Sequence, residues 1–96
     1  MIPIVQAEFV TIPENVIFKK VGEETVLLDF EGGVYYGLDS VGSRMWEMLA
    51  EGKSFEEVGA AMAEEYDATP EAIASDLDAL VAELESHGLV ARRNQS

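Results

Sequence analysis

The chain of 96 residues has no cysteine, a single histidine and only six basic residues. Without cysteine it cannot form a disulfide, a thiolate metal site or a thiol nucleophile, and nothing indicates an oxidising compartment. Its apolar runs are much shorter than the roughly 18 residues that a membrane-spanning helix needs. The N-terminal residues MIPIVQAEF lack the basic start and the unbroken apolar stretch of a signal peptide. We therefore expect a cytoplasmic protein that makes no membrane contact.

The scarcity of basic residues also bears on nucleic acids. The chain carries 19 acidic residues and a formal net charge of −13, and no Lys or Arg occurs between Ser54 and Ala91. Lys and Arg contacts to phosphates supply most non-specific affinity for nucleic acids. We therefore expect no nucleic-acid partner, whereas a surface of this charge attracts cationic peptide segments.

Three segments in the first half of the chain have the composition of strands. They are rich in β-branched, aromatic and aliphatic residues, and the turn-forming stretches VGEE and EGG separate them. The predicted strands are Val16–Lys20, Thr25–Phe30 and Val34–Leu38. We expect them to form an antiparallel meander of two hairpins.

For the second hairpin we predict a three-residue loop, 31–33, in preference to a two-residue turn. The longer loop gathers apolar residues on one face, and Gly33 can take the left-handed conformation that it requires. Tyr36 then lies in the core, while Tyr35 lies on the opposite face beside Asp29. The predicted pairs are Phe30 with Val34, Leu28 with Tyr36, and Val26 with Leu38.

The second half predicts three helices. The first begins at Asp39 or Ser40 as N-cap and ends at Gly52, and the second begins with a capping box made by Ser54 and Glu57. Apolar residues at helical spacing predict the buried faces. They are Val41, Met45, Trp46, Met48 and Leu49 in the first helix, and Phe55, Val58, Met62 and Tyr66 in the second.

The third helix has the clearest boundaries. Thr69 is the expected N-cap with Pro70 at the first helical position, and Gly88 follows the last turn. Its apolar stripe consists of Ile73, Leu77, Leu80, Val81 and Leu84. Three strands followed by three helices predict a single α+β domain, residues 1–96, with a winged helix-turn-helix-like arrangement. The segments 1–14 and 92–96 are the candidates for flexible ends.

No catalytic or metal site emerges from the residues. His87 is the only histidine and fits a cation-capable position near a helix C-terminus. The paired glutamates match no calcium-binding loop, and EGGVYYG lacks the lysine of a phosphate-binding loop. We expect no enzymatic activity, no catalytic or metal-binding residues and no cofactor.

The candidate site is instead the edge of the predicted sheet at the strand Val34–Leu38. This strand has no Lys, Pro or blocking charge, and Gly37 lowers the steric barrier along it. Two interpretations remain open: one of the protein's own helices covers this edge, or an extended peptide adds to it as a further strand. For the second, the candidate peptide-binding residues are Val34, Tyr35, Tyr36, Gly37, Leu38, Asp76, Leu77, Leu80, Val81 and Leu84, with most of the helical stripe expected to be core.

The segment LLDFEGGVYYGLDSVGSRMWEML resembles the signature segment of PqqD-like proteins. It is most similar to the free-standing leader-peptide-binding proteins of lasso-peptide biosynthesis. The helices match this family only in pattern. The matching positions are Leu28, Asp29, Gly33, Tyr35, Tyr36, Gly37, Leu38, Asp39, Val41, Gly42, Met45, Trp46 and Leu49.

The resemblance implies a recognition element for ribosomally synthesised and post-translationally modified peptides (RiPPs). In the family, the leader of a precursor peptide joins the third strand and lies against the third helix. Lasso leaders offer a Tyr-x-x-Pro element and a nearby aliphatic residue. The implied partners are the precursor leader, a separate cysteine-protease-like leader peptidase and, as a further candidate, the macrolactam cyclase.

Two alternatives belong to other functional classes. A PqqD-type peptide chaperone would serve a radical-SAM or other RiPP maturase. A winged-helix transcription regulator is compatible with the predicted fold alone, and the charge of the chain argues against it.

Overall fold

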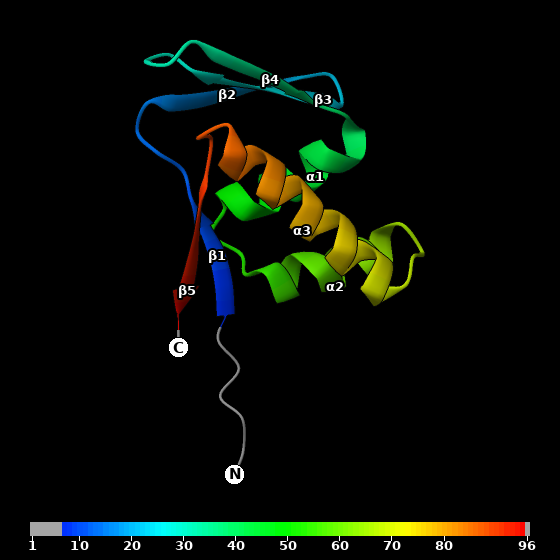
Figure 1. Ribbon diagram of the computed structural model, residues 1–96. Coiled ribbons are helices and arrows are strands. Elements are labelled where there is room, and N and C mark those ends of the chain that lie inside the picture. The colour runs from blue at the N-terminus through cyan, green and yellow to red at the C-terminus, as the bar shows by residue number, and fades with distance from the viewer. Residues whose placement is uncertain (1–6, 96) are drawn as a thin grey trace.

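The computed structural model describes residues 7–95 as an α+β domain, which confirms the predicted fold class. Three helices pack under an antiparallel sheet of order β2-β3-β4, and a second antiparallel sheet pairs β1 with β5 (Figure 1). The elements are β1 (Ala7–Thr11), β2 (Val16–Val21), β3 (Glu24–Asp29), β4 (Val34–Leu38), α1 (Ser40–Ala50), α2 (Phe55–Glu65), α3 (Pro70–Ser86) and β5 (Ala91–Gln95).

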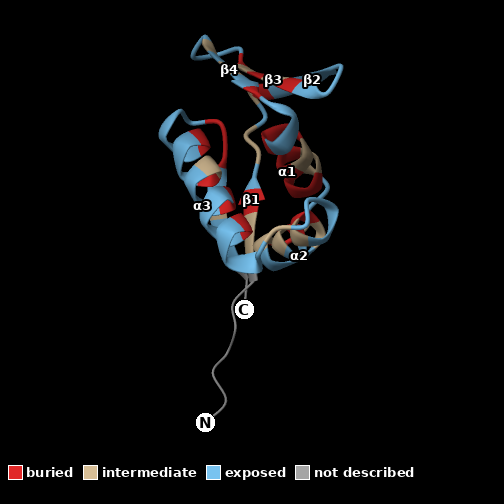
Figure 2. Cartoon of the chain, turned by 90° about the vertical axis from the view of Figure 1, so that its right-hand side faces the viewer, coloured by how far each residue is buried: buried red, intermediate tan, exposed pale blue. Residues whose placement is uncertain are grey.

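The core lies between the helices and beneath the β2-β3-β4 sheet. Figure 2 shows α3 on one side and α1 and α2 on the other, with their buried residues turned toward each other. Trp46 of α1 is fully buried and meets the ring of Phe18 of β2 edge-on, with 5.2 Å between ring centroids. Leu27 is the central buried residue of β3. Burial of such side chains is the main favourable term in folding.

The β1–β5 sheet was not predicted from the sequence. Its strands include residues 7–11 and 92–95, which fall within the segments named as candidates for flexible ends. Leu89 and Val90 are buried just before β5 and lead the chain from α3 into this strand. Arg92 then bonds to Asp78 of α3, with 2.7 Å between Nη1 and Oδ1. Burial and this ion pair together hold the end of the described chain against α3.

The predicted helix caps are confirmed. Asp39 caps α1 and accepts a hydrogen bond from the backbone N–H of Gly42. Ser54 and Glu57 form the reciprocal capping box of α2, and Thr69 caps α3. Each cap satisfies a backbone N–H that the helix itself leaves without a partner.

Two residues predicted for the buried helical faces are exposed instead, Val41 and Tyr66. The buried face of α1 is centred on Gly42, Met45, Trp46 and Leu49, so Val41 lies at its margin. Tyr66 is the C-cap of α2, beyond its last regular turn. The prediction from apolar spacing therefore made the buried face of each helix one residue too long, at the start of α1 and at the end of α2.

The predicted register of the second hairpin is wrong by one residue. The structure pairs Leu27 with Tyr36 and Leu28 with Tyr35, so the loop has four residues, 30–33. Because a shift of one residue turns a strand over, Leu27 faces the helices and Leu28 the outer face. The predicted face of β4 is correct: Tyr36 packs against the core, whereas Tyr35 is 70% exposed.

The corrected register changes the surroundings of several other residues. Val26 lies on the outer face, opposite Gly37, and Phe30 lies in the loop with its side chain exposed. Asp29 pairs with Val34 and is buried, so it does not lie beside Tyr35 as predicted.

A hydrogen-bond network around Asp29 explains this register. The Asp29 carboxylate accepts hydrogen bonds from the Asn15 side chain at 2.7 Å and from the backbone N–H groups of Glu31 and Gly32 at 3.0 Å. A Cβ on Gly32 would lie 2.6 Å from the carboxylate, and Gly33 takes a positive φ of 73°. Only glycine suits both positions without strain. A charged residue is buried here because the loop supplies its donors.

We predict that the Asp29 network makes stability depend on pH. Hydrogen bonds from Gly32 and then Asn15 lower the pKa of Asp29 below its ordinary value of 3.8. A carboxyl group with a lowered folded pKa stabilises the fold above the ordinary value, and this stabilisation is lost as pH falls through the folded pKa. The free energy of unfolding in urea should differ most between the wild type and Asp29→Asn near neutral pH. This difference should become smaller below about pH 4. A gap that stays constant would show that the ionised carboxylate is not responsible.

We also predict different roles for the two adjacent tyrosines. Tyr36→Ala removes a ring that packs on the core and should cost about 2 kcal/mol of unfolding free energy. Tyr35→Ala should change it by less than about 0.5 kcal/mol, because the ring is largely exposed. Chemical denaturation of both variants measures the difference. Equal losses would contradict the observed orientation of β4.

Candidate functional site

The strand β4 is an outer strand of its sheet. It pairs with β3 along one edge, and no other strand in residues 7–95 pairs with its second edge. This edge therefore has backbone N–H and C=O groups available for an added strand. Figure 2 shows α3 running below the side of the sheet where β4 lies.

Two polar residues near the C-terminal end of α3 face Tyr36 of β4. The rings of Tyr36 and His87 lie 5.4 Å apart between centroids and are tilted by 49°. Burial, and then the nearby carboxylate of Glu83, raise the pKa of Tyr36. Residues three or four apart share one side of a helix. Asp76 and Leu80 therefore continue this side, and we call Asp76, Leu80, Glu83 and His87 the α3 flank.

The ten residues predicted as a peptide-binding site fall into three groups. Val34, Tyr36 and Leu80 are half-buried at the surface. Tyr35, Gly37 and Asp76 are exposed, although Tyr35 points to the other face of the sheet. The remaining four belong to the buried core: Leu38, Leu77, Val81 and Leu84. A bound peptide could not contact these four side chains without rearrangement of the core.

Sequence reasoning missed two residues of this region, Glu83 and His87. Apart from Asp76, it selected the apolar positions of α3 and passed over the polar ones. The available signal was spacing, since Glu83 lies three residues after Leu80 and His87 four residues later still. The region thus combines half-buried apolar side chains with a polar rim that carries negative charge.

Typical free energies of hydrogen bonding, apolar burial and association indicate what this region can bind. Four added backbone hydrogen bonds at about 1 kcal/mol each only match the low end of the roughly 4–15 kcal/mol cost of association. Two or three apolar anchors at about 1.5–3 kcal/mol each must supply the remainder. Val34, Tyr36 and Leu80 offer partly exposed apolar surface for such anchors. An extended peptide with aliphatic or aromatic side chains fits these requirements.

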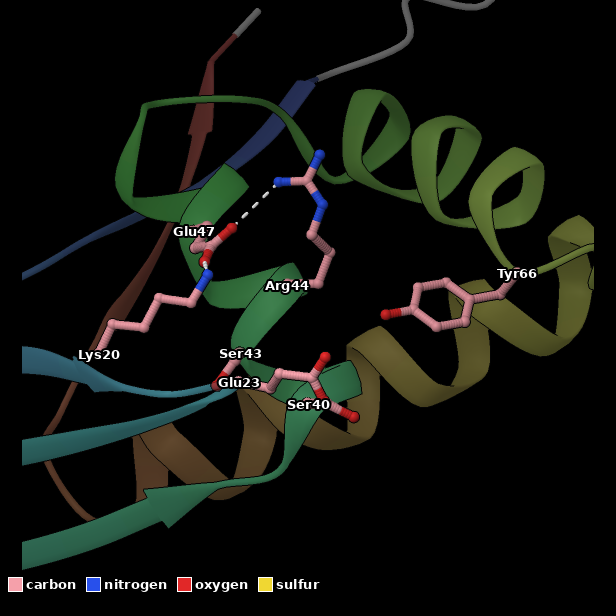
Figure 3. Close-up of a pocket in the computed structure, with 7 residues that line it drawn as sticks. All are labelled: Lys20, Glu23, Ser40, Ser43, Arg44, Glu47 and Tyr66. Atoms are coloured by element: carbon pink, nitrogen blue, oxygen red, sulfur yellow. Dashed lines mark hydrogen bonds and ion pairs between the residues drawn. The ribbon is translucent and has the colours of Figure 1, made fainter.

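A separate polar recess of about 160 Å³ lies between the sheet and the helices α1 and α2 (Figure 3). Its cations are already paired: Lys20 bonds to Glu47 at 2.6 Å, and Arg44 bonds to Glu47 at 3.1 Å and to Glu65 at 2.9 Å. The bonds that Lys20 and, to a smaller extent, Arg44 make to Glu47 lower the pKa of Glu47. The recess is therefore an ion-pair network that ties β2 and α2 to α1, and it leaves no free cation there to bind an anion.

Within residues 7–95, no group of three or more His, Cys, Asp or Glu side chains is arranged to hold a metal ion. None of the helices that the structure describes is long and apolar enough to cross a membrane. The edge of β4 with the α3 flank remains the strongest candidate.

Comparison with known proteins gives a family match. The model of the PqqD family, described as coenzyme PQQ synthesis protein D, matches residues 24–90. This range contains β3, β4 and all three helices. None of the curated proteins compared with the chain matches it.

Two solved structures are similar over most of the chain. One is TbiB1 in complex with the TbiA(beta) leader peptide, which is 37% identical with a TM-score of 0.79 and 82% of this chain and 92% of that chain covered. The other is lasso peptide synthetase B1 complexed with the leader peptide. It is 23% identical with a TM-score of 0.80, and the match covers 85% of this chain and 96% of that one. At that identity the second match supports the fold alone.

Proposed function

The chain belongs to the PqqD family, and from this premise we propose that it binds the leader segment of a ribosomally made lasso precursor peptide. It acts as a RiPP recognition element and performs no chemistry itself. The 37% identical relative TbiB1 was solved with a leader peptide bound, which supports this class of ligand. The structural match over 92% of that chain, with a TM-score of 0.79, supports a shared mode of action.

In the proposed mode of binding, the leader adds to β4 as an antiparallel strand and lies against α3. The observation that carries the proposal is the second edge of β4, which no strand within residues 7–95 occupies. Backbone pairing would give affinity with little sequence preference, while side chains on the inner face would contact Val34, Tyr36 and Leu80. Asp76 and Glu83 would favour a cationic residue in the leader.

The bound leader is then delivered to other proteins. We propose a separate cysteine-protease-like leader peptidase as the recipient, with the macrolactam cyclase as a further candidate partner. A binding protein without catalytic groups can accelerate such a reaction by raising the effective concentration of the precursor at the peptidase. The site of action is the cytoplasm, where precursors are synthesised.

A second candidate function is a peptide chaperone for a radical-SAM or other RiPP maturase. The description of the matching family as coenzyme PQQ synthesis protein D favours it. The two functions use the same edge of β4 and differ in the leader that binds. A winged-helix transcription regulator is disfavoured by the net charge of −13 and by an α3 that contains no Lys or Arg.

The direct test is a comparison of leader and core peptides. Fluorescence anisotropy with a labelled lasso leader should give a dissociation constant in the nanomolar to low micromolar range, because the leader supplies both backbone pairing and apolar anchors. The core segment of the same precursor should not bind. Equal affinity for the two peptides would reject leader recognition, and binding of a PQQ-type leader alone would favour the second candidate.

We further predict that charges introduced beside the edge of β4 weaken leader binding. Val34→Glu and Leu80→Glu should each reduce affinity about tenfold or more, because each replaces an apolar anchor by a charge. Ala60→Glu, at an exposed position of α2, introduces the same charge away from β4 and serves as the matched control. Glu64→Lys should likewise have little effect. A larger loss in the controls than in Val34→Glu and Leu80→Glu would assign the leader to another surface.

A further inference from the structure

The polar recess between the sheet, α1 and α2 contains a carboxylate without an ionic partner. The two cations of the recess, Lys20 and Arg44, are paired with the carboxylates of Glu47 and Glu65. Glu23, in the turn between β2 and β3, lines the same recess and takes part in no ion pair within residues 7–95. Three carboxylates are thus present for two cations. The remaining negative charge favours a cationic ligand.

A second polar group of the recess also lacks a partner. Ser43 lines the recess from α1 and is only 1% exposed. Its hydroxyl oxygen accepts or donates no hydrogen bond among the described residues. A buried hydroxyl without a partner costs free energy, and such groups are rare in folded proteins. Rotation about χ1 turns this hydroxyl toward a donor that enters the recess, so Ser43 indicates a ligand that donates hydrogen bonds.

Tyr66 provides an aromatic wall at the end of α2. It was predicted to be buried, but as the C-cap of this helix it is 43% exposed. Figure 3 shows its hydroxyl directed into the recess, with Glu23 and Ser40 on the opposite side. A cation is attracted to the face of such a ring, and the planar guanidinium group of arginine also stacks on it. The exposed ring of Tyr66 is therefore suited to hold a guanidinium group.

The size of the recess limits the ligand to a single side chain. Its volume of about 160 Å³ is close to the roughly 150 Å³ of an engineered cavity that holds one benzene molecule. A guanidinium group is planar and smaller than benzene, and it presents several N–H donors in a fixed arrangement. It can therefore bond to the carboxylate of Glu23 and the hydroxyl of Ser43 together. A strand or helix of a peptide is too large to enter.

We propose that this recess binds the side chain of an arginine that a partner protein carries. The carboxylate of Glu23 pairs with the guanidinium group, the hydroxyl of Ser43 accepts a hydrogen bond from it, and the ring of Tyr66 covers one of its faces. None of the residues that line the recess belongs to β4 or α3. The arginine and the leader strand therefore occupy different surfaces, and the site does not depend on the proposed function. The net charge of −13 attracts a basic partner of this kind.

The test is an NMR titration of the isotope-labelled full chain with N-acetyl-arginine amide. The amide signals of Glu23, Ser43 and Tyr66 should shift together with a dissociation constant of about 1–10 mM, as expected for one side chain. N-acetyl-citrulline amide has nearly the same shape without the charge and should bind at least about fivefold more weakly. Glu23→Gln should weaken arginine binding by about fivefold. Glu24→Gln is the matched control, because it removes the same charge from the next residue, which pairs with Val21 on the outer face of the sheet.

Ser43→Ala is a second variant that separates binding from folding. It should weaken arginine binding about threefold and leave the free energy of unfolding unchanged or slightly raised, because it removes a buried hydroxyl that has no partner. A loss of stability without a loss of arginine affinity would show that Ser43 has a structural role only.

Repeating the titration with saturating leader separates this site from the proposed function. The arginine affinity should stay within about twofold of its value without leader. Displacement of the arginine compound by the leader would assign the recess to the leader and overturn the proposal of a partner protein. Equal binding of the citrulline compound, or equal effects of Glu23→Gln and Glu24→Gln, would overturn the site itself. Equal binding of N-acetyl-lysine amide would overturn the choice of a guanidinium group. A chain that binds the arginine compound and no leader would overturn the proposed function alone.

Discussion

The hydrogen bonds to the buried carboxylate of Asp29 determine how the sheet is used. They close the loop between β3 and β4 at four residues and so set the register of the hairpin. A strand shifted by one residue exchanges its two faces. With another register, Leu28 would face the helices and would no longer lie between Ile17 and Tyr35 on the outer face. The network thus determines both the composition of the core and the character of the opposite surface.

The strand β4 connects two surfaces because its side chains alternate between them. Tyr36 points to α3, where it meets His87 and Glu83, while Tyr35 points away from the helices. The backbone between these side chains carries the edge that no strand within residues 7–95 occupies. A peptide added at this edge would contribute side chains to both surfaces at once.

An open strand edge and an exposed apolar face would ordinarily favour aggregation. The net charge of −13 opposes this, because copies of the chain repel one another. The same charge favours basic partners and disfavours nucleic acids. The acidic composition therefore helps a small protein to expose both a strand edge and an apolar sheet face without aggregating.

Local features of the sequence determined the three strands β2, β3 and β4, the three helices and the caps of those helices. The caps at Asp39, Ser54 and Thr69, the three helices, the outward position of Tyr35 and the resemblance carried by residues 27–49 all follow from patterns within a few residues. Such patterns are readable because a cap or a helical face involves neighbours three or four positions apart.

Only the tertiary structure decided the register, the terminal sheet and the composition of the site. The register depends on a bond between Asn15 and Asp29, fourteen residues apart, and β1 meets β5 across most of the chain. The α3 flank exists because Glu83 and His87 meet Tyr36, and the core absorbs Leu77, Val81 and Leu84 because other helices cover them. Contacts between residues distant in sequence leave no periodic pattern, so local rules could not reveal them.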